Sequence, residues 1–561
     1  MKLMIRADAS SEIGTGHVMR MIALAQAWQD RGGTPVIATA RCPDSLKQRL
    51  ASEHIGHVQL NDVEMGSLAD ATETAKLALE LDADWIVLDG YHFDIEYQRA
   101  IRSTTGRKLL VVDDCEANKP RCADAILNQN IYADELDYQS EVQGCVNLLG
   151  LKYVLLRREF TQSVTAARSE RHQVQRVLVT LGGGDPDNVT AKVLKLLETS
   201  TNRCLEIRVI IGAANPFFET LRTTATQSRH KIEFLQNVTD MSSQFIWADA
   251  VVTAAGSTCW EWLLFGLRGA VVEIADNQSR IAQTLAHREM ALNLGWHQDL
   301  SGPHVQHCLE SLIETPLPPP RAETRSLAID THGARRVCAV MSPQLKITIA
   351  TSLSGWLLPH LNQWRDELVA QGHAVEIVGE LTHPTEGDLL FLLSYWSIVP
   401  GHVLQKFSHC LVVHESELPH GRGWSPVSWA VLDGQSVVPG CLLEASANVD
   451  AGEIYYRDQM TLEGDELLDE IRELQAQMTF RLCNRFIANY PAVSACGMPQ
   501  QGTPTYLPRR GPSDSQLDPE KSIAEQFDLL RIVDNESYPA FFEWRGQRYQ
   551  LAISKSEQPQ Q

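Results

Sequence analysis

Short apolar runs alternate with helical patterns along the N-terminal part of the chain. The strand-like runs are residues 2–5, 35–39, 85–88, 109–112 and 125–127, and residues 68–81 show helical spacing. Alternation of this kind predicts a parallel α/β sheet with helices on both faces. Ligands of such sheets lie at the carboxyl ends of the strands, so polar residues that follow strands become candidate site residues.

The same pattern returns twice further along the chain. Residues 175–180, 207–211, 232–235, 250–253 and 270–273 are the strand-like runs of a second region. Residues 345–350, 374–378, 389–393 and 410–413 are those of a third, with helical spacing at 358–371. We therefore predict two Rossmann-like lobes at 1–165 and 166–342, a further Rossmann-like domain at 343–495 and a small C-terminal subdomain at 496–561. A helical pattern at 334–341 is expected to pack back on the lobes.

Composition narrows the class of protein. The 561 residues are 44% hydrophobic and 21% charged, as in a globular enzyme. The net charge of −21 opposes a large nucleic-acid footprint. The 12 cysteines include no C-x-x-C pair, and no apolar run is long enough for a membrane span. We expect a cytoplasmic enzyme with no metal site, no nucleic-acid partner and no membrane segment, and the sequence leaves open whether it is a homodimer.

A glycine-rich turn between the first strand and the first helix is the strongest local signal. Gly14 and Gly16 allow close approach of a ligand, and the helix start offers N–H groups to an anion. His17 can exchange a proton near neutral pH, and Arg20 follows one turn later. The alternative interpretation is a tight turn with a packed histidine.

Other polar clusters follow later strands. Asp89 and Tyr91 follow one strand and Asp113-Asp114 another, where each cluster can either serve chemistry or cap a helix. In the second region a small or hydroxyl residue at a helix start can hold a diphosphate, and an acidic residue one turn on can bind ribose hydroxyls. The candidates are Gly183, Gly184, Gly256, Ser257, Thr258, Glu261, Asn277 and Gln278. The alternative for Glu261 is a solvated helix face.

Taken together, these motifs resemble the UDP-sugar hydrolase family of pseudaminic acid biosynthesis, relatives of the two-lobed (GT-B type) glycosyltransferases. The resemblance covers about residues 1–340. It implies that water attacks the anomeric carbon with inversion, that His17 acts as general base or positions the water, and that the second lobe holds UDP. Leu267-Arg268 departs from the family, which often has proline there.

The third region carries a different signature. His414 ends a strand and is followed by Ser416, Pro419 and Arg422, and an Asp-x-Gly-x-Ile element begins at Asp450. These residues resemble the N10-formyltetrahydrofolate-dependent formyltransferases. The resemblance implies that His414 polarises the formyl oxygen or carries the proton and that Asp450 orients it. The family has an asparagine at the position of Val412, so another donor is needed, with Ser416 or a backbone N–H as candidates.

The tail after the third region resembles amino-sugar formyltransferases. Arg509 and Arg510, with Arg531 further on, can meet a nucleotide diphosphate or form surface ion pairs. The resemblances together predict a bifunctional enzyme that releases UDP from a 2,4-diamino-2,4,6-trideoxy-altrose derivative and transfers a formyl group from N10-formyltetrahydrofolate to a sugar amine. A GT-B glycosyltransferase, a non-catalytic formyltransferase-like domain and, less favoured, a methionyl-tRNA acceptor stay open.

Overall fold

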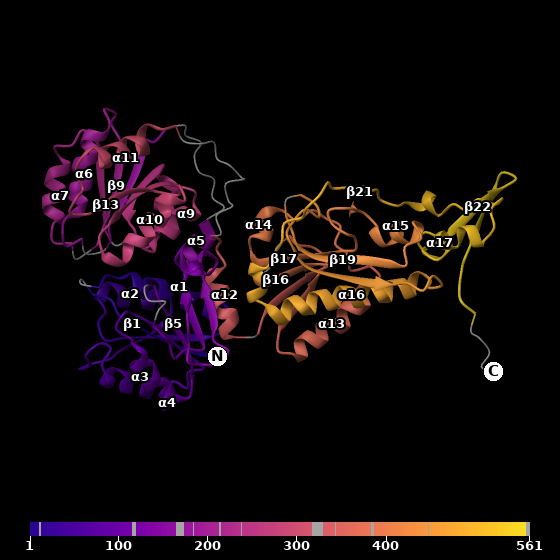
Figure 1. The fold of residues 1–561 in the computed structure, drawn as a ribbon, viewed down its shortest axis with the longest axis horizontal. Helices are drawn as coiled ribbons and strands as arrows, with labels where there is room; N and C mark the ends of the chain where they lie inside the picture. The colour runs from indigo at the N-terminus through magenta and orange to yellow at the C-terminus, as the bar shows by residue number, and fades with distance from the viewer. Residues whose placement is uncertain are drawn as a thin grey trace. The chain divides into compact units, whose positions relative to one another are not determined.

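The chain forms two compact units, Met1–Met341 and Ser342–Gln561. The computed structural model describes residues 1–10, 13–114, 119–163, 173–182, 185–212, 215–236, 238–316, 329–342, 344–382, 386–446 and 448–556. The first unit runs from indigo to magenta in Figure 1, and the second is orange to yellow. None of the described helices has both the length and the apolar character that a membrane crossing requires.

The first lobe is a parallel sheet in the order β3-β2-β1-β4-β5-β6-β7. Its strands are β1 (Lys2–Ala7), β2 (Thr34–Thr39), β3 (Gly56–Gln59), β4 (Trp85–Asp89), β5 (Lys108–Val112), β6 (Ala125–Asn128) and β7 (Val146–Leu149). Its helices are α1 (Gly16–Asp30), α2 (Asp44–Ser52), α3 (Leu68–Glu80) and α4 (Ile95–Thr105), with short turns η1 (Ala133–Glu135) and η2 (Leu151–Tyr153). The short α5 (Arg158–Ser163) follows and packs into the core of the second lobe. The strand order reverses between β1 and β4, which is where open parallel sheets bind ligands.

The second lobe repeats this design in the order β10-β9-β8-β11-β12-β13. Its strands are β8 (Arg176–Thr180), β9 (Glu206–Ile211), β10 (Lys231–Gln236), β11 (Ala250–Ala254), β12 (Arg268–Glu273) and β13 (Leu292–Trp296). The helices are α6 (Val189–Ser200), α7 (Phe218–Ala225), α8 (Met241–Trp247), α9 (Thr258–Leu264), η3 (Asp276–Gln278), α10 (Ser279–His287) and α11 (Pro303–Glu314). The predicted α/β class of both lobes is confirmed.

Helix α12 (Gly333–Met341) follows the second lobe in sequence but packs into the first. Val337 and Cys338 are fully buried in the same apolar cluster as Val18 of α1. The contact requires a glycine at its start, because a Cβ on Gly333 would lie 2.1 Å from the carbonyl oxygen of Val154. The expectation that this helix packs back on the lobes is therefore confirmed.

The second unit contains one mixed sheet in the order β15-β14-β16-β17-β19-β20. Its parallel strands are β14 (Lys346–Ala350), β15 (Ala374–Val378), β16 (Gly387–Leu392) and β17 (Phe407–His414), and its antiparallel strands are β19 (Val437–Glu444) and β20 (Ile454–Thr461). The helices are α13 (Leu358–Ala370), α14 (Gly401–Leu404), α15 (Pro426–Leu432), α16 (Leu468–Asn489), η4 (Ala492–Ala495), η5 (Pro512–Ser515), η6 (Ala524–Gln526) and α17 (Phe527–Leu530).

The C-terminal segment returns to the loop after β17 through a short two-stranded ladder. Strand β21 (Tyr506–Leu507) pairs in parallel with β18 (Arg422–Gly423), which lies in the long loop after β17. This pairing brings the segment that carries Arg509 and Arg510 next to the loop that follows His414. The chain then ends in a hairpin of β22 (Ala540–Trp544) and β23 (Gln547–Leu551).

Candidate active sites

The glycine-rich turn of the first lobe places His17 against the end of β4. Gly14 has φ of 75°, a left-handed conformation that closes the turn, and Gly16 is the first residue of α1. Nδ1 of His17 lies 2.7 Å from Oδ1 of Asp89, the last residue of β4. Nε2 of His17 has no hydrogen-bond partner among the described residues. The carboxylate therefore holds the ring by one nitrogen and leaves the other for a proton transfer.

Arg20 binds the same carboxylate from the next turn of α1. Its Nε and Nη2 lie 2.7 and 2.5 Å from the two oxygens of Asp89, and its Nη1 lies 2.7 Å from Oδ2 of Asp114. Burial opposes ionisation of Asp89, but Arg20 and His17 hold its pKa well below the ordinary value. Asp89 thus stays charged beside His17. Asp113 instead pairs with Arg121, so the Asp113-Asp114 cluster divides between two arginines.

Tyr91 connects this group to the second lobe. Its ring lies 5.0 Å from the ring of His17, edge to face, and its hydroxyl donates to Asp114 Oδ2 at 3.4 Å. Nδ2 of Asn277, in η3, donates to the Tyr91 hydroxyl at 2.8 Å. Residues predicted separately from the two lobes are thereby brought together.

The structure describes only part of the glycine-rich turn of the second lobe. Gly183 and Gly184 lie outside the described residues. Asp185, just after them, accepts hydrogen bonds from the backbone N–H groups of Val189 and Thr190 at 2.7 and 2.9 Å. It therefore caps α6, and its carboxylate occupies N–H groups that we expected a phosphate to use.

The other turn of this lobe remains compatible with anion binding. Ser257 and Thr258 begin α9, and the Ser257 side chain makes no capping hydrogen bond. Gln278 lies alongside, because a Cβ on Gly256 would be 3.8 Å from its Nε2. Its Oε1 accepts from the Ile274 N–H at 3.0 Å, which fixes the amide. The structure thus brings the Gly256–Thr258 segment and Gln278 into one place.

Glu261 is not on a solvated helix face, so that alternative is wrong. Its side chain is 13% exposed, and its carboxylate lies 3.0 Å from Nη1 of Arg157. Burial raises its pKa, and Arg157 counteracts this. Arg157 also pairs with Glu159 at 3.0 Å, and Glu159 binds Arg49 of the first lobe at 2.8 Å. The sequence predicted Glu261 but not this chain of charges, because its members are up to about 200 residues apart.

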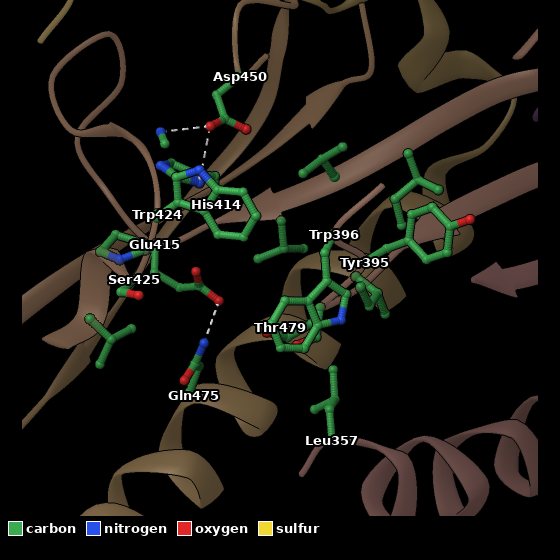
Figure 2. Close-up of a pocket in the computed structure, with 18 of the residues that line it drawn as sticks. Leu357, Tyr395, Trp396, His414, Glu415, Trp424, Ser425, Asp450, Gln475 and Thr479 are labelled. Atoms are coloured by element: carbon green, nitrogen blue, oxygen red, sulfur yellow. Dashed lines mark hydrogen bonds and ion pairs between the residues drawn. The ribbon is translucent and has the colours of Figure 1, made fainter. Parts of the chain in front are cut away.

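In the second unit, His414 ends β17 and is held from both sides. Its Nε2 lies 2.8 Å from the carbonyl oxygen of Gly421, which can only accept, so the hydrogen is on Nε2. Its Nδ1 lies 3.6 Å from Oδ2 of Asp450, and the same oxygen accepts from the Gly423 N–H at 2.9 Å. Figure 2 shows the pair at one end of a cavity. The predicted partners His414 and Asp450 are thus brought together.

The cavity beside His414 has a volume of about 680 Å³. Its wall combines indole and aliphatic surfaces with a few polar groups, among them Trp356, Tyr395, Trp396, Ile398, Trp424, Ser425, Gln475, Thr479 and Arg510. Apolar walls with a small polar end are typical of cofactor and small-ligand sites. Val412 also lines the cavity and presents only methyl groups to it.

Glu415 is a residue of the cavity that sequence reasoning missed. It follows His414, lines the cavity, and accepts a hydrogen bond from Nε2 of Gln475 at 2.7 Å (Figure 2). Burial raises its pKa, although His414 and Gln475 act in the other direction. A carboxyl next to the key histidine was a visible signal, but its partner lies on α16, 60 residues further on.

Two of the predicted binding residues, Ser416 and Arg422, do not line the cavity. Ser416 is buried, is not part of the cavity wall, and its hydroxyl has no hydrogen-bond partner among the described residues. Arg422 donates to Oε1 of Gln500 at 2.6 Å, and Gln500 donates to the carbonyl oxygen of Asp450 at 2.8 Å. Arg422 therefore braces the loop that carries Asp450.

The arginines of the tail separate into two groups. The Arg509 guanidinium lies 5.7 Å from the ring of Trp396 and 5.0 Å from that of Trp424, at the cavity, and Arg510 lines the cavity itself. Arg531 is 4% exposed and pairs with Glu466 at 2.8 Å, so of the two alternatives it forms the ion pair, which is buried and not at the surface. Among the described residues, no cluster of His, Cys, Asp or Glu is arranged to hold a metal ion.

Two protein-family models match separate parts of the chain. Formyl transferase matches residues 361–479, and Glycosyltransferase family 28 C-terminal domain matches residues 176–329. The chain joins a glycosyltransferase-28-like region to a formyltransferase domain.

Individual relatives follow the same division. The N-terminal region is 26% identical over 291 residues to UDP-2,4-diacetamido-2,4,6-trideoxy-beta-L-altropyranose hydrolase of Campylobacter jejuni, covering 51% of this chain and 97% of that protein. It is 24% identical over 294 residues to spore coat polysaccharide biosynthesis protein SpsG of Bacillus subtilis, covering 52% of this chain and 83% of that protein.

The C-terminal region matches methionyl-tRNA formyltransferases. It is 27% identical over 110 residues to that of Rickettsia typhi, covering 19% of this chain and only 36% of that protein. The solved methionyl-tRNA formyltransferase from Clostridium thermocellum overlays on 38% of this chain and 94% of its own length, with 22% identity and a TM-score of 0.33. The predicted resemblance of the N-terminal region to UDP-sugar hydrolases and of the C-terminal region to formyltransferases is confirmed.

Proposed function

We propose that the chain is a bifunctional nucleotide-sugar enzyme of pseudaminic (nonulosonic) acid biosynthesis. One half would release UDP from a UDP-2,4-diamino-2,4,6-trideoxy-altrose derivative, and the other would transfer a formyl group to a sugar amine. One observation carries the proposal: each family-matched unit holds a histidine and an aspartate together at a strand end, His17 with Asp89 and His414 with Asp450.

In the first unit, His17 would activate or position the attacking water. The ionised Asp89 accepts from Nδ1, so Nε2 carries the lone pair that takes a proton. Arg20 keeps Asp89 ionised and fixes its direction. The start of α9 at Ser257 and Thr258 would bind the leaving diphosphate, whose charge needs stabilisation as the sugar bond breaks. One displacement by water inverts the anomeric carbon.

Glu261 would bind the ribose from one turn into α9. Its carboxylate lies in the first turn of α9, where an ion pair with Arg157 holds it in place. Asn277 and Gln278 lie on the neighbouring loop, and Asn277 already reaches Tyr91 of the first lobe. These contacts support a nucleotide held by the second lobe with its sugar directed toward His17.

In the second unit, the cavity suits N10-formyltetrahydrofolate. Its indole and aliphatic walls fit a flat heteroaromatic ring, and His414, Glu415 and Asp450 form the polar end. The bound cofactor supplies the formyl group. His414 donates from Nε2 to Gly421, so its ring is fixed while Nδ1 and Asp450 manage the proton that leaves the nitrogen as it is acylated. The acceptor side would be formed by Trp424 and Arg509, whose stacked faces suit a nucleotide-linked sugar.

The proposal is tested by mass spectrometry of the products from UDP-2-acetamido-4-amino-2,4,6-trideoxy-altrose, with and without N10-formyltetrahydrofolate. A free sugar heavier by one formyl group, formed only with the folate, supports both activities. UDP release without the mass gain would leave the second unit as a binding module. Sugar consumption only after addition of an acceptor sugar would instead identify a glycosyltransferase.

A further inference from the structure

The carboxyl group of Glu415 has no assigned task, although it lies in the wall of the cavity beside His414. Its Oε1 accepts from Gln475 Nε2 at 2.7 Å, and the carboxyl group also accepts from its own backbone N–H, so neither of these partners neutralises its charge. The neighbouring acidic side chain of the same loop, Glu417, is 63% exposed and pairs with Arg457 at 2.5 Å. The two carboxylates are two residues apart, and only Glu415 faces the cavity.

We infer that Glu415 is a further catalytic residue of the second unit, which binds the protonated amine of the acceptor sugar and takes its proton. The inference rests on the proposed formyl transfer. An amine attacks a formyl carbon only after it loses a proton, because an ammonium group has no free electron pair. A carboxylate that lines the cavity and is directed by a neutral amide donor is suited to hold that ammonium group.

The charges around Glu415 favour this task. His414 on β17 and Asp450 before β20 are the titratable groups that act on its ionisation. The other charged groups in the cavity wall are Glu444, Arg472, Arg510 and Asp534, of which Arg472 pairs with Asp534 at 2.9 Å and Glu444 with His409 at 2.8 Å. Burial raises the pKa of Glu415, which makes it a stronger base than an exposed carboxylate. Gln475 fixes its direction without a charge.

The reaction balances without a further reagent. The ammonium group gives one proton to Glu415, and the neutral amine forms the new C–N bond to the formyl carbon. The bond from that carbon to N10 of the folate breaks, and N10 takes up the second proton of the acylated nitrogen. Glu415 then returns its proton to solvent.

The test is the pH profile of formyl transfer by Glu415→Gln, with UDP-2-acetamido-4-amino-2,4,6-trideoxy-altrose and N10-formyltetrahydrofolate as substrates. The variant has the same shape but cannot take a proton, so kcat/KM at neutral pH should fall about 100-fold or more. Its activity should then rise about tenfold per pH unit as the free amine becomes available, so the deficit narrows at high pH. Glu417→Gln is the matched control and should behave as the wild type.

A second variant keeps the inference falsifiable if Glu415→Gln folds poorly. Gln475→Ala should lose about fivefold to tenfold in kcat/KM, because the carboxylate loses the hydrogen bond that directs it. Full activity of Glu415→Gln, or a deficit that is the same at every pH, would overturn the inference while formyl transfer by the wild type stands. Absence of transfer by both the wild type and Glu417→Gln would overturn the proposed function, and this inference with it.

Discussion

His17 and Asp89 lie 2.7 Å apart, although they come from the first helix and the fourth strand of the first lobe. Their contact exists because β1 and β4 are neighbours in the sheet, with Ala7 opposite Asp89. The start of α1, which carries His17, therefore lies beside the end of β4. This relationship orients the His17 ring, as the proposed role of general base requires.

Replacement of His17 should separate the chemistry of the first unit from its stability. We expect His17→Ala to lower the rate of UDP release from UDP-2,4-diacetamido-2,4,6-trideoxy-altrose about 100-fold or more, because the general base is lost. A continuous assay of UDP measures it. His307→Ala, an exposed histidine on α11, is the control and should leave the rate unchanged. Equal rates for the two variants would leave His17 as a packed residue of the turn.

Asp89 should make the first unit sensitive to acid. Its pKa is lower in the folded chain than in the unfolded one, so the ionised carboxylate stabilises the fold above about pH 4, and this stability is lost as the pH falls toward the folded-state pKa. Asp89→Asn leaves Arg20 short of a buried partner and should cost about 3–5 kcal/mol near neutral pH. Urea unfolding of both proteins should show that this difference shrinks below about pH 4. A difference that does not vary with pH would refute the assignment.

Asp450 should matter for formyl transfer alone. Asp450→Asn keeps an acceptor for the Gly423 N–H but removes the charge 3.6 Å from His414. We expect formyl transfer to fall about 100-fold or more, while UDP release from the diacetamido substrate is unchanged. Both products can be followed by chromatography. His402→Ala, an exposed histidine on α14, serves as control. Parallel loss of both activities would indicate misfolding rather than lost chemistry.

Arg531 should contribute to stability and not to substrate binding. It is buried and paired with Glu466 at 2.8 Å, and its Nε donates to the Glu466 carbonyl oxygen at 3.0 Å. Arg531→Ala should lower the free energy of unfolding of the second unit by about 3–5 kcal/mol, because the carboxylate is left without its partner. The KM for the sugar should stay within about twofold of the wild type. A large rise in KM with unchanged stability would return Arg531 to the binding site.

Local sequence patterns predicted the buried parallel strands and the edge strands β10 and β15, but they missed other edge strands. β1, β4 and β5 are continuous apolar runs because both faces of the sheet are covered. β3 and β7 were missed, since each is an edge strand that mixes polar with apolar residues and is partly exposed. β20 was missed because it carries solvent-facing residues such as Arg457 and Gln459. β19 is mostly buried, but Pro439 and Gly440 interrupt its apolar run.

In the candidate sites, too, local sequence patterns predicted single residues but not the contacts between distant ones. His17, Arg20 and Asp89 could be predicted because each stands at the end of a strand or the start of a helix. Their mutual contacts, the capping role of Asp185 and the pairing of Glu261 with Arg157 depend on how separate elements meet. Glu415 was visible beside His414, but its task depends on Gln475 of α16, which no local pattern connects to it.

The most direct test of whether the chain has both activities is to identify the product of the His17→Ala variant. The variant is given N10-formyltetrahydrofolate and UDP-2-acetamido-4-amino-2,4,6-trideoxy-altrose. Mass spectrometry should show a sugar that still carries UDP and has gained one formyl group, while the wild type gives the free formylated sugar. Release of UDP by the variant at the wild-type rate, or absence of the formyl group from both products, would contradict the account.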